Sequence, residues 1–261
     1  MRQKLTTTNQ SVGKVLQIIE IMSQNRGAMK LQDISVKSGL PVSTALRMVN
    51  TLLSYGYVRQ DPVTLRYALT LKFAQLGSLV SSQFRITDIM RPYLIELSDK
   101  SGEAVCYAAD QDMELIYMDV IDGPDGILKV MQRIGKRAPL HCTGIGKIML
   151  LNYSQKELRH FVSAKGLLSY TPKTIVTKET LQRELEKVRR AGYAMDDEEC
   201  ELGARCVAAG IKDYTGRYIG GISVSGPISR LTLERTEILK GAVMDAAKKI
   251  SEALAYQEET E

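Results

Sequence analysis

The chain has 261 residues, of which 44% are hydrophobic and 25% charged, so it has room for one large domain or two ordinary ones, each with its own core. No stretch approaches the roughly 20 consecutive apolar residues that cross a bilayer. The first ten residues, MRQKLTTTNQ, lack the apolar core of a signal peptide. The composition therefore predicts neither a membrane protein nor a secreted one, and its four cysteines are interpreted as reduced cytoplasmic thiols.

Charge is distributed unevenly along the chain. Residues 1–75 contain ten lysines and arginines but only three acidic residues, a net charge of +7, whereas the whole chain carries only +5. A basic segment joined to a weakly acidic body indicates that this segment binds a polyanion. A merely well-solvated surface is the alternative interpretation.

The N-terminal segment predicts three short helices followed by a β-hairpin. The first helix has an apolar stripe at helical spacing, formed by Val12, Val15, Leu16, Ile19 and Met22. A second, shorter helix stops at Gly39, and a third begins at Pro41 with the stripe Leu46, Val49, Leu52 and Leu53. The hairpin spans 57–69 around a turn at Asp61-Pro62. Three helices and a hairpin in this order predict a winged helix-turn-helix.

The opposite face of the third helix is polar and suits base recognition. Arginine can clamp guanine, asparagine can pair with adenine, and threonine can touch the methyl group of thymine. The residues predicted to contact double-stranded DNA from this face are Ser43, Thr44, Arg47 and Asn50. Thr64 and Arg66, near the hairpin tip, are predicted to reach phosphate or the minor groove. An ordinary solvated helix face, or a winged helix that serves only as a protein interaction module, are the alternatives.

The rest of the chain predicts a linker and an α+β domain. Helical spacing continues to about residue 100, and strands joined by short turns then alternate with helices, which indicates an antiparallel sheet. One of these strands is predicted over 127–131. The predicted boundaries are a winged helix-turn-helix over 1–80, linker helices over 81–101 and a second domain over 102–261.

A series of short motifs follows this plan along nearly the whole chain. The front part has Gly39-Leu40-Pro41 and Gly56-Tyr57-Val58, and the back part has Pro139-Leu140-His141, Gly146-Lys147, Gly192-Tyr193, Arg205-Cys206 and the run from Ile222 to Pro227. In this order and spacing they resemble the IclR family of bacterial transcriptional regulators. The resemblance implies a GAF- or profilin-like effector-binding domain, and homodimers or homotetramers that bind palindromic operators. It also implies a ligand site containing Asp196, Cys206, Ser223 and Ser225.

The residues themselves support such a site. Ser223 and Ser225 are two positions apart in a predicted strand, so their hydroxyls face the same side. Gly144 and Ile145 precede a helical run, where free N–H groups favour an anion and glycine permits close approach to the backbone. Ile127 and Val130 could form apolar walls. Together these groups predict a small carboxylate that also carries a carbonyl or hydroxyl. Ile145 is bulkier than the small residue usual there in the family, which would reshape the pocket.

Structural roles remain open for the same residues. The two serines could bond only to backbone, Asp196 could cap a turn, and Cys206 could be a small buried hydrophobe. An enzyme is a further alternative, because Cys206, His141 and Asp196 could form a nucleophile, a base and an orienting acid. The run around Gly144–Lys147 fails as a phosphate loop because His141 and Ile148 occupy required positions. The sequence predicts no cofactor, no metal site and no catalysis.

Overall fold

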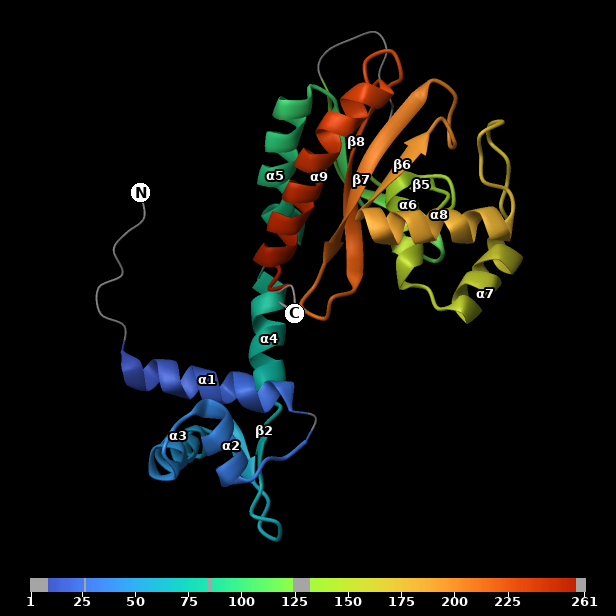
Figure 1. The fold of residues 1–261 in the computed structure, drawn as a ribbon. Helices are drawn as coiled ribbons and strands as arrows, with labels where there is room; N and C mark the ends of the chain where they lie inside the picture. The colour runs from blue at the N-terminus through green and yellow to red at the C-terminus, as the bar shows by residue number, and fades with distance from the viewer. Residues whose placement is uncertain (1–8, 26, 84–85, 124–131, 257–261) are drawn as a thin grey trace. The chain divides into compact units, whose positions relative to one another are not determined.

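The computed structural model describes residues 9–25, 27–83, 86–123 and 132–256, and it divides the chain into two compact units (Figure 1). The units are Met1–Phe84 and Arg85–Glu261. The predicted strand at 127–131, with Ile127 and Val130, lies outside the described residues. Within the described ranges, no helix is both long and apolar enough to cross a membrane.

The first unit has the predicted winged helix-turn-helix. Its elements in chain order are α1 (Gln10–Gln24), α2 (Leu31–Ser38), α3 (Val42–Ser54), β1 (Val58–Gln60), β2 (Tyr67–Leu69) and α4 (Lys72–Gln83). The strands β1 and β2 pair as an antiparallel hairpin. Gly39 ends α2 with a φ of 65°, a left-handed conformation that glycine adopts without strain. This residue makes the sharp turn that sets α3 across α2.

The apolar stripes predicted for α1 and α3 are partly wrong. In α1 the buried residues are Ile18 and Met22, whereas Val12 and Leu16 are more than half exposed. In α3 the buried residues are Ala45, Met48, Val49 and Leu52, whereas Leu46 and Leu53 lie at the exposed margins of the core. The cause of the error is the same in both helices. Where apolar residues are frequent, the spacing i, i+3, i+4 fits two adjacent stripes, and the spacing does not indicate which of the two is buried. Pro41 also lies one position outside α3, as its N-cap.

The second unit is an α+β domain built on one antiparallel sheet. Its helices are α5 (Ile86–Ser101), α6 (Gly144–Met149), α7 (Gln155–Lys165), α8 (Lys178–Ala191) and α9 (Leu233–Ala253), with a 3₁₀ turn, η1 (Leu150–Asn152), after α6. Its strands are β3 (Ala104–Gln111), β4 (Glu114–Ile121), β5 (Arg137–Ala138), β6 (Tyr193–Asp197), β7 (Ala204–Lys212) and β8 (Tyr218–Pro227). The sheet order is β5-β4-β3-β8-β7-β6, and neighbouring strands are antiparallel.

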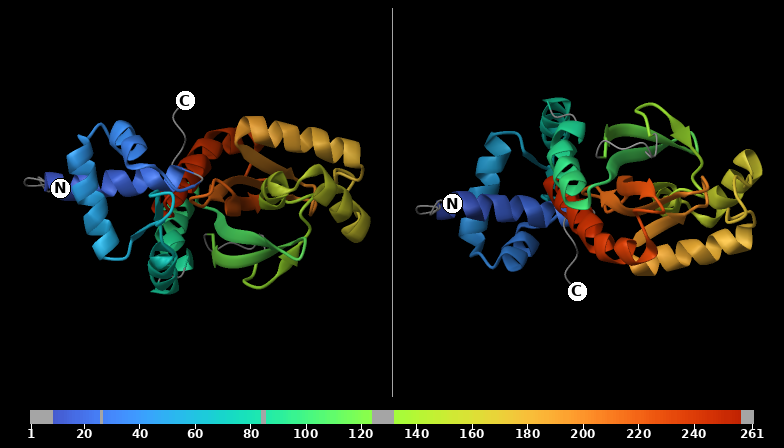
Figure 2. Two further views of the ribbon diagram at one scale, coloured as in Figure 1. Left: turned by 90° about the horizontal axis from the view of Figure 1, so that it is seen from below. Right: turned by 90° about the horizontal axis from the view of Figure 1, so that it is seen from above.

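Helices cover both faces of this sheet. The helices α5 and α9 lie against one face, and α6, α7 and α8 lie on the other, as the views of Figures 1 and 2 agree. Side chains alternate between the two cores along each strand. Ile222 and Val224 pack towards α5 and α9, so Ser223 and Ser225 face the side of α6, as predicted. The two-residue period of β8 therefore predicts correctly that both serines lie on the face of the sheet that α6 covers, and α6 begins at Gly144.

Local sequence signals account for the start of α7, whereas strands β5 and β6 are not predicted from the sequence. The capping box opens α7, with Ser154 accepting from the Glu157 backbone N–H and the Glu157 side chain accepting from the Ser154 N–H. Strand β6 is missed because it follows directly on the end of α8 at Gly192, with no turn residues between them. Residues 86–101, predicted as part of a linker, form α5, which packs on α9 within the second unit.

Candidate functional site

The polar face of α3 is exposed. Ser43, Arg47 and Asn50 are exposed and Thr44 is half-buried, whereas the opposite face carries the core. The exposed residues border a shallow hollow together with Leu46, Thr51 and Ser54. Three of the four residues predicted to contact DNA from this helix therefore share one open surface, with Thr44 at its edge.

The hairpin residues predicted to contact DNA are used differently. The Thr64 hydroxyl donates to Asp61 Oδ1 at 2.8 Å, which closes the turn at the tip. Arg66 Nη1 donates to the Ala28 carbonyl at 3.3 Å, so its guanidinium is held against the segment between α1 and α2. The Thr64 hydroxyl thus has a hydrogen-bond partner within the turn, and the Arg66 guanidinium has one distant in sequence. Neither partner could be predicted from the sequence alone.

A cavity of about 290 Å³ lies in the second unit, and all six residues predicted to bind an effector line it. They come from separate parts of the chain: α6 begins with Gly144 and Ile145, Asp196 lies on β6, Cys206 on β7, and the two serines on β8. The structure brings these residues to one place because β8, β7 and β6 are neighbours in the sheet and α6 packs across them. Sequence reasoning does not identify the other lining residues, among them Tyr117, Gln132, Lys136 and Arg137.

A row of polar side chains runs across the wall formed by β3 and β8. Cys106 Sγ lies 3.2 Å from Ser223 Oγ, which lies 3.3 Å from Ser225 Oγ. Gln132 Nε2 donates to Ser225 Oγ at 3.0 Å, and Gln132 Oε1 is buried without a hydrogen-bond partner. Both serines are 2% exposed. A hydroxyl can donate as well as accept, so this row can rearrange to bond a ligand.

Asp196 lines the cavity from β6, where it pairs with Cys206 of β7, which in turn pairs with Ser225 of β8. Its Oδ1 accepts hydrogen bonds from the backbone N–H groups of Glu199 at 2.8 Å and Cys200 at 3.2 Å. Burial raises the pKa of Asp196 to about 7, against the lowering effect of those two donors. The protonated form of Asp196 is therefore accessible near neutral pH, and in that form Asp196 can donate a hydrogen bond into the cavity. Asp196 can therefore bond the turn at Glu199 and Cys200 and also line the cavity.

Gly144 is needed for packing against β7. A Cβ at this position would lie 2.9 Å from Cys206 Sγ and 3.0 Å from Ala208 Cβ. The bulk of Ile145 is accommodated by Gly221, where a Cβ would lie 2.9 Å from Ile145 Cγ2. The glycine at the start of α6 thus allows helix and strand to approach closely, whereas sequence reasoning assigns it to ligand approach.

The arrangement required for cysteine catalysis is not formed by the three proposed residues. His141 Nε2 lies 3.0 Å from the Leu168 carbonyl oxygen, and this histidine lines a different hollow from Cys206. Burial raises the pKa of the Cys206 thiol, so the thiolate that would act as nucleophile is disfavoured. Among the described residues, no group of three or more His, Cys, Asp or Glu side chains is placed to hold a metal ion.

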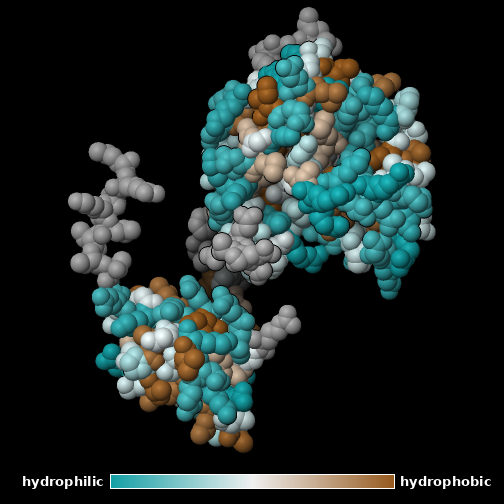
Figure 3. Space-filling view, in the orientation of Figure 1, coloured by the Kyte–Doolittle hydropathy of each residue, from teal (hydrophilic) through white to brown (hydrophobic). Residues whose placement is uncertain are grey.

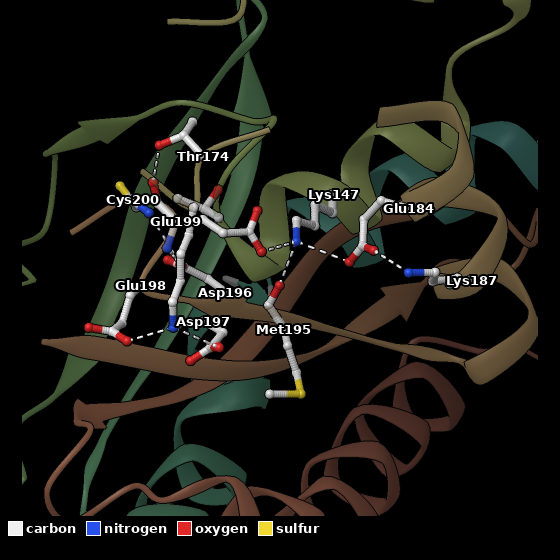
Figure 4. A network of polar contacts seen from close by, with 12 residues as sticks. Lys147, Thr174, Glu184, Lys187, Met195, Asp196, Asp197, Glu198, Glu199 and Cys200 are labelled. Atoms are coloured by element: carbon white, nitrogen blue, oxygen red, sulfur yellow. Dashed lines mark hydrogen bonds and ion pairs between the residues drawn. The ribbon is translucent and has the colours of Figure 1, made fainter. Parts of the chain in front are cut away.

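A buried ion-pair network lies behind the cavity (Figure 4). Lys147 is fully buried, and its Nζ contacts Glu199 Oε1 at 2.6 Å, Glu184 Oε1 at 3.1 Å and the Met195 carbonyl at 2.7 Å. Burial lowers the pKa of Lys147, but the two carboxylates outweigh it and the net shift is upward. Glu199 also donates its backbone N–H to Asp196. The network therefore connects α6 and α8 to the loop that holds Asp196.

Charges at the rim of the cavity are mixed. Lys136 and Glu201 line it, and Lys136 is exposed. Arg205 also lines it but bonds Asp197 and the Leu231 carbonyl, and Arg137 bonds Glu114 at 2.8 Å. Lys136 is thus the lining cation that the described contacts leave facing solvent.

Comparison with known proteins identifies the family. The model described as "Bacterial transcriptional regulator IclR C-terminal" matches residues 78–252, and that of the IclR helix-turn-helix domain matches residues 11–62. The chain is 34% identical over 249 residues to the transcriptional repressor IclR of Escherichia coli K12, covering 95% of this chain and 90% of that protein. It is 31% identical over 247 residues to the regulator XynR of the same organism, covering 95% and 98%.

Solved structures agree with this result. The Thermotoga maritima IclR crystal structure is similar with a TM-score of 0.63 and 31% identity, covering 94% of this chain and 99% of that one. A putative IclR regulator from Silicibacter matches in fold, with a TM-score of 0.80 at 23% identity over 95% and 97% of the two chains. The curated relatives are regulators of transcription and not enzymes. On these matches the chain belongs to the IclR family of bacterial transcriptional regulators and is itself a DNA-binding regulator.

Proposed function

We propose that the chain binds a palindromic DNA operator through α3, and that a small carboxylate in the cavity of the second unit changes its affinity for that operator. The observation that carries the effector part is the 290 Å³ cavity, which gathers six residues from α6, β6, β7 and β8. A cavity of this size suits a small metabolite and not a polymer.

The chemistry of the lining favours an acid that also carries a hydroxyl or carbonyl. The serine hydroxyls and Gln132 Nε2 can donate to a carboxylate, and Lys136 adds a positive charge at the rim. Protonated Asp196, two strands away from Ser225 on the same face of the sheet, can donate to a second oxygen of the ligand. Gln132 Oε1, which has no partner, can accept from a ligand hydroxyl.

The effector proposal is tested by thermal-shift screening of small hydroxy and oxo acids, followed by calorimetry on the acid that stabilises most. Ser223→Ala and Ser225→Ala should each weaken binding by about 0.5–3 kcal/mol, the range for lost hydrogen bonds. If both serines hold one carboxylate, the double variant should depart from the sum of the single changes. Ser169→Ala, outside the cavity lining, is the matched control. Equal affinity in all variants removes the serines from the site.

Linkage provides the test of regulation. Whatever factor the acid applies to operator affinity, the operator must apply to the affinity for the acid. Calorimetry with and without bound operator should therefore give two different dissociation constants for the acid. Identical values would show that the cavity does not regulate DNA binding at equilibrium.

The DNA-binding part is tested at Arg47. Arg47→Ala should weaken binding to a selected operator by about 1–3 kcal/mol per half-site and leave nonspecific binding nearly unchanged, because a base contact is lost. Arg189→Ala, an exposed arginine on α8, removes the same charge from the second unit and serves as the control. Equal losses for specific and nonspecific DNA would assign Arg47 to phosphate, and unchanged binding would contradict the role of α3.

A further inference from the structure

Two cysteines lie in contact at the wall of the cavity. Cys142 is fully buried in the turn before α6, and Cys200 is half-buried in the β6–β7 loop, where it lines the cavity. Both are free thiols, and their side chains form a hydrogen bond with each other although they are distant in sequence. The fold thus pairs two cysteines that no sequence motif connects.

Hydrogen bonds of neighbouring residues hold this pair in place (Figure 4). Lys147 Nζ on α6 contacts Glu199 Oε1 at 2.6 Å, one position before Cys200. Thr174 Oγ1 donates to the Glu199 carbonyl at 2.6 Å, and the Cys200 N–H donates to Asp196 Oδ1 at 3.2 Å. The loop is therefore fixed against α6 on both sides of the thiol, and the two sulfurs can react without a rearrangement of the chain.

The two thiols differ in acidity. The hydrogen bond from Cys142 lowers the pKa of Cys200, because it stabilises the thiolate and outweighs burial. Asp196 and Glu201 oppose this effect, and Lys136 at the rim of the cavity adds to it. The same hydrogen bond, together with burial, raises the pKa of Cys142. Cys200 is therefore the thiol that ionises first, and Cys142 is the protonated partner beside it.

Solvent reaches this pair more readily than the other two cysteines. The helices α7 and α8, which cover this face of the sheet, are mainly hydrophilic on their outer surface in Figure 3, so this side of the second unit is in contact with water. Cys106 and Cys206 are at most 9% exposed, and burial raises the pKa of both thiols. An accessible thiolate beside a second thiol is the usual arrangement of redox-sensitive cysteines.

We propose that Cys142 and Cys200 form a peroxide-sensitive modification site, which closes to a disulfide in the wall of the cavity. The Cys200 thiolate attacks one oxygen of hydrogen peroxide, the O–O bond breaks, and the leaving hydroxide takes up the proton that Cys200 released. Cys200 is then a sulfenic acid. The Cys142 sulfur attacks the Cys200 sulfur, the S–O bond breaks, and the hydroxyl leaves as water with the proton of Cys142. Two thiols are oxidised, and one peroxide is reduced to two waters.

The disulfide acts on the cavity because of where its two ends lie. It joins the loop whose N–H groups bond Asp196 to the turn that leads into Gly144 and Ile145, and all three of these residues line the cavity. Oxidation therefore fixes two walls of the cavity to each other. This inference goes beyond the proposed function, because it requires neither an effector nor DNA.

The test treats the reduced full-length protein with hydrogen peroxide and counts free thiols. Wild type should lose two of its four thiols, and dithiothreitol should restore them. Peptide mapping without reduction should recover one intramolecular link, between Cys142 and Cys200. The rate of thiol loss should rise with pH and level off below about pH 8.5, the ordinary pKa of a free cysteine, because the reacting species is the Cys200 thiolate.

Single variants assign the order of the two steps. Cys142→Ala should stop at a sulfenic acid on Cys200, which dimedone traps, and should react more slowly because the hydrogen bond that favours the thiolate is lost. Cys200→Ala should keep its three remaining thiols under the same conditions. Cys106→Ala, which removes a buried cysteine outside the pair, is the matched control and should form the link as wild type does. Circular dichroism confirms that each variant is folded.

Hydrogen exchange measures the effect on the loop. The backbone N–H groups of Glu199 and Cys200 should exchange more slowly in the oxidised protein, and equal exchange in the two states would contradict the restraint on the cavity. A link that involves Cys106 or Cys206, a link between two chains, or four free thiols after exposure to a peroxide concentration that oxidises free cysteine overturns the inference. None of these results bears on DNA binding or on the effector, so the proposed function is tested separately.

Discussion

Asp196 is a carboxyl group whose ionisation opposes folding. Its pKa is about 7 in the folded chain and 3.8 in the reference state, because burial penalises the charged form. Between these values the unfolded chain has released the proton while the folded chain keeps it. The contribution of Asp196 to stability therefore falls as the pH rises from about 4 to about 7.

Asp196→Asn should remove this dependence. The amide keeps an oxygen that can accept from Glu199 and Cys200, and it carries no charge at any pH. We expect the variant to exceed wild type in free energy of unfolding by about 1–3 kcal/mol at pH 8, with a smaller difference at pH 5. Urea denaturation at the two pH values measures both differences.

The neighbouring Asp197 provides the control with the opposite sign. Its pKa is lowered, because ion pairs with Arg205 and Lys173 outweigh its partial burial. Its stabilising contribution is present above the unfolded pKa and is lost as the pH falls through the folded pKa. Asp197→Asn should therefore destabilise most at neutral pH. If the two variants showed the same pH dependence, the assignment of Asp196 as a protonated group would be wrong.

The packing of α6 depends on charges as well as on glycine. Lys147 is the buried centre that joins α6 to Glu184 on α8 and to Glu199 in the β6–β7 loop. Lys147→Met keeps much of the volume but leaves two carboxylates without their cation. Breaking a buried ion pair in this way should lower the free energy of unfolding by about 3–5 kcal/mol.

Lys187→Met is the matched control for that prediction. Lys187 also pairs with Glu184, at 3.7 Å, but its side chain is 72% exposed. The same substitution there should change stability by at most about 0.5 kcal/mol, because exposed pairs contribute little. Urea denaturation followed by circular dichroism compares the two variants. Similar small effects at both positions would contradict the view that Lys147 anchors α6.

Assembly follows from the size of the DNA-binding surface. A single winged helix reads a short half-site, and specific binding usually needs two half-sites about one helical turn apart or a multiple of it. We expect the protein to be at least a dimer at micromolar concentration by light scattering, and to protect an inverted repeat in a footprint. A monomer that protects one unrepeated site would contradict this prediction.

Much of the secondary structure could be predicted because it depends on local chemistry. Gly39 ends α2, Ser154 and Glu157 begin α7, and the turn at Asp112 and Met113 joins β3 to β4. The inner stripe of α1 could not be chosen correctly, because Val12 and Ile18 are equally apolar and only the position of the other helices decides which is buried.

Motif spacing predicts the family, and the two-residue period of a strand predicts the orientation of Ser223 and Ser225. Which side chains are free to act depends instead on the tertiary structure. It placed Gln132 beside Ser225, directed Arg66 to Ala28 and brought the thiol of Cys142 to that of Cys200. The physical reason is that hydrogen bonding and burial depend on neighbours distant in sequence, which no local pattern specifies.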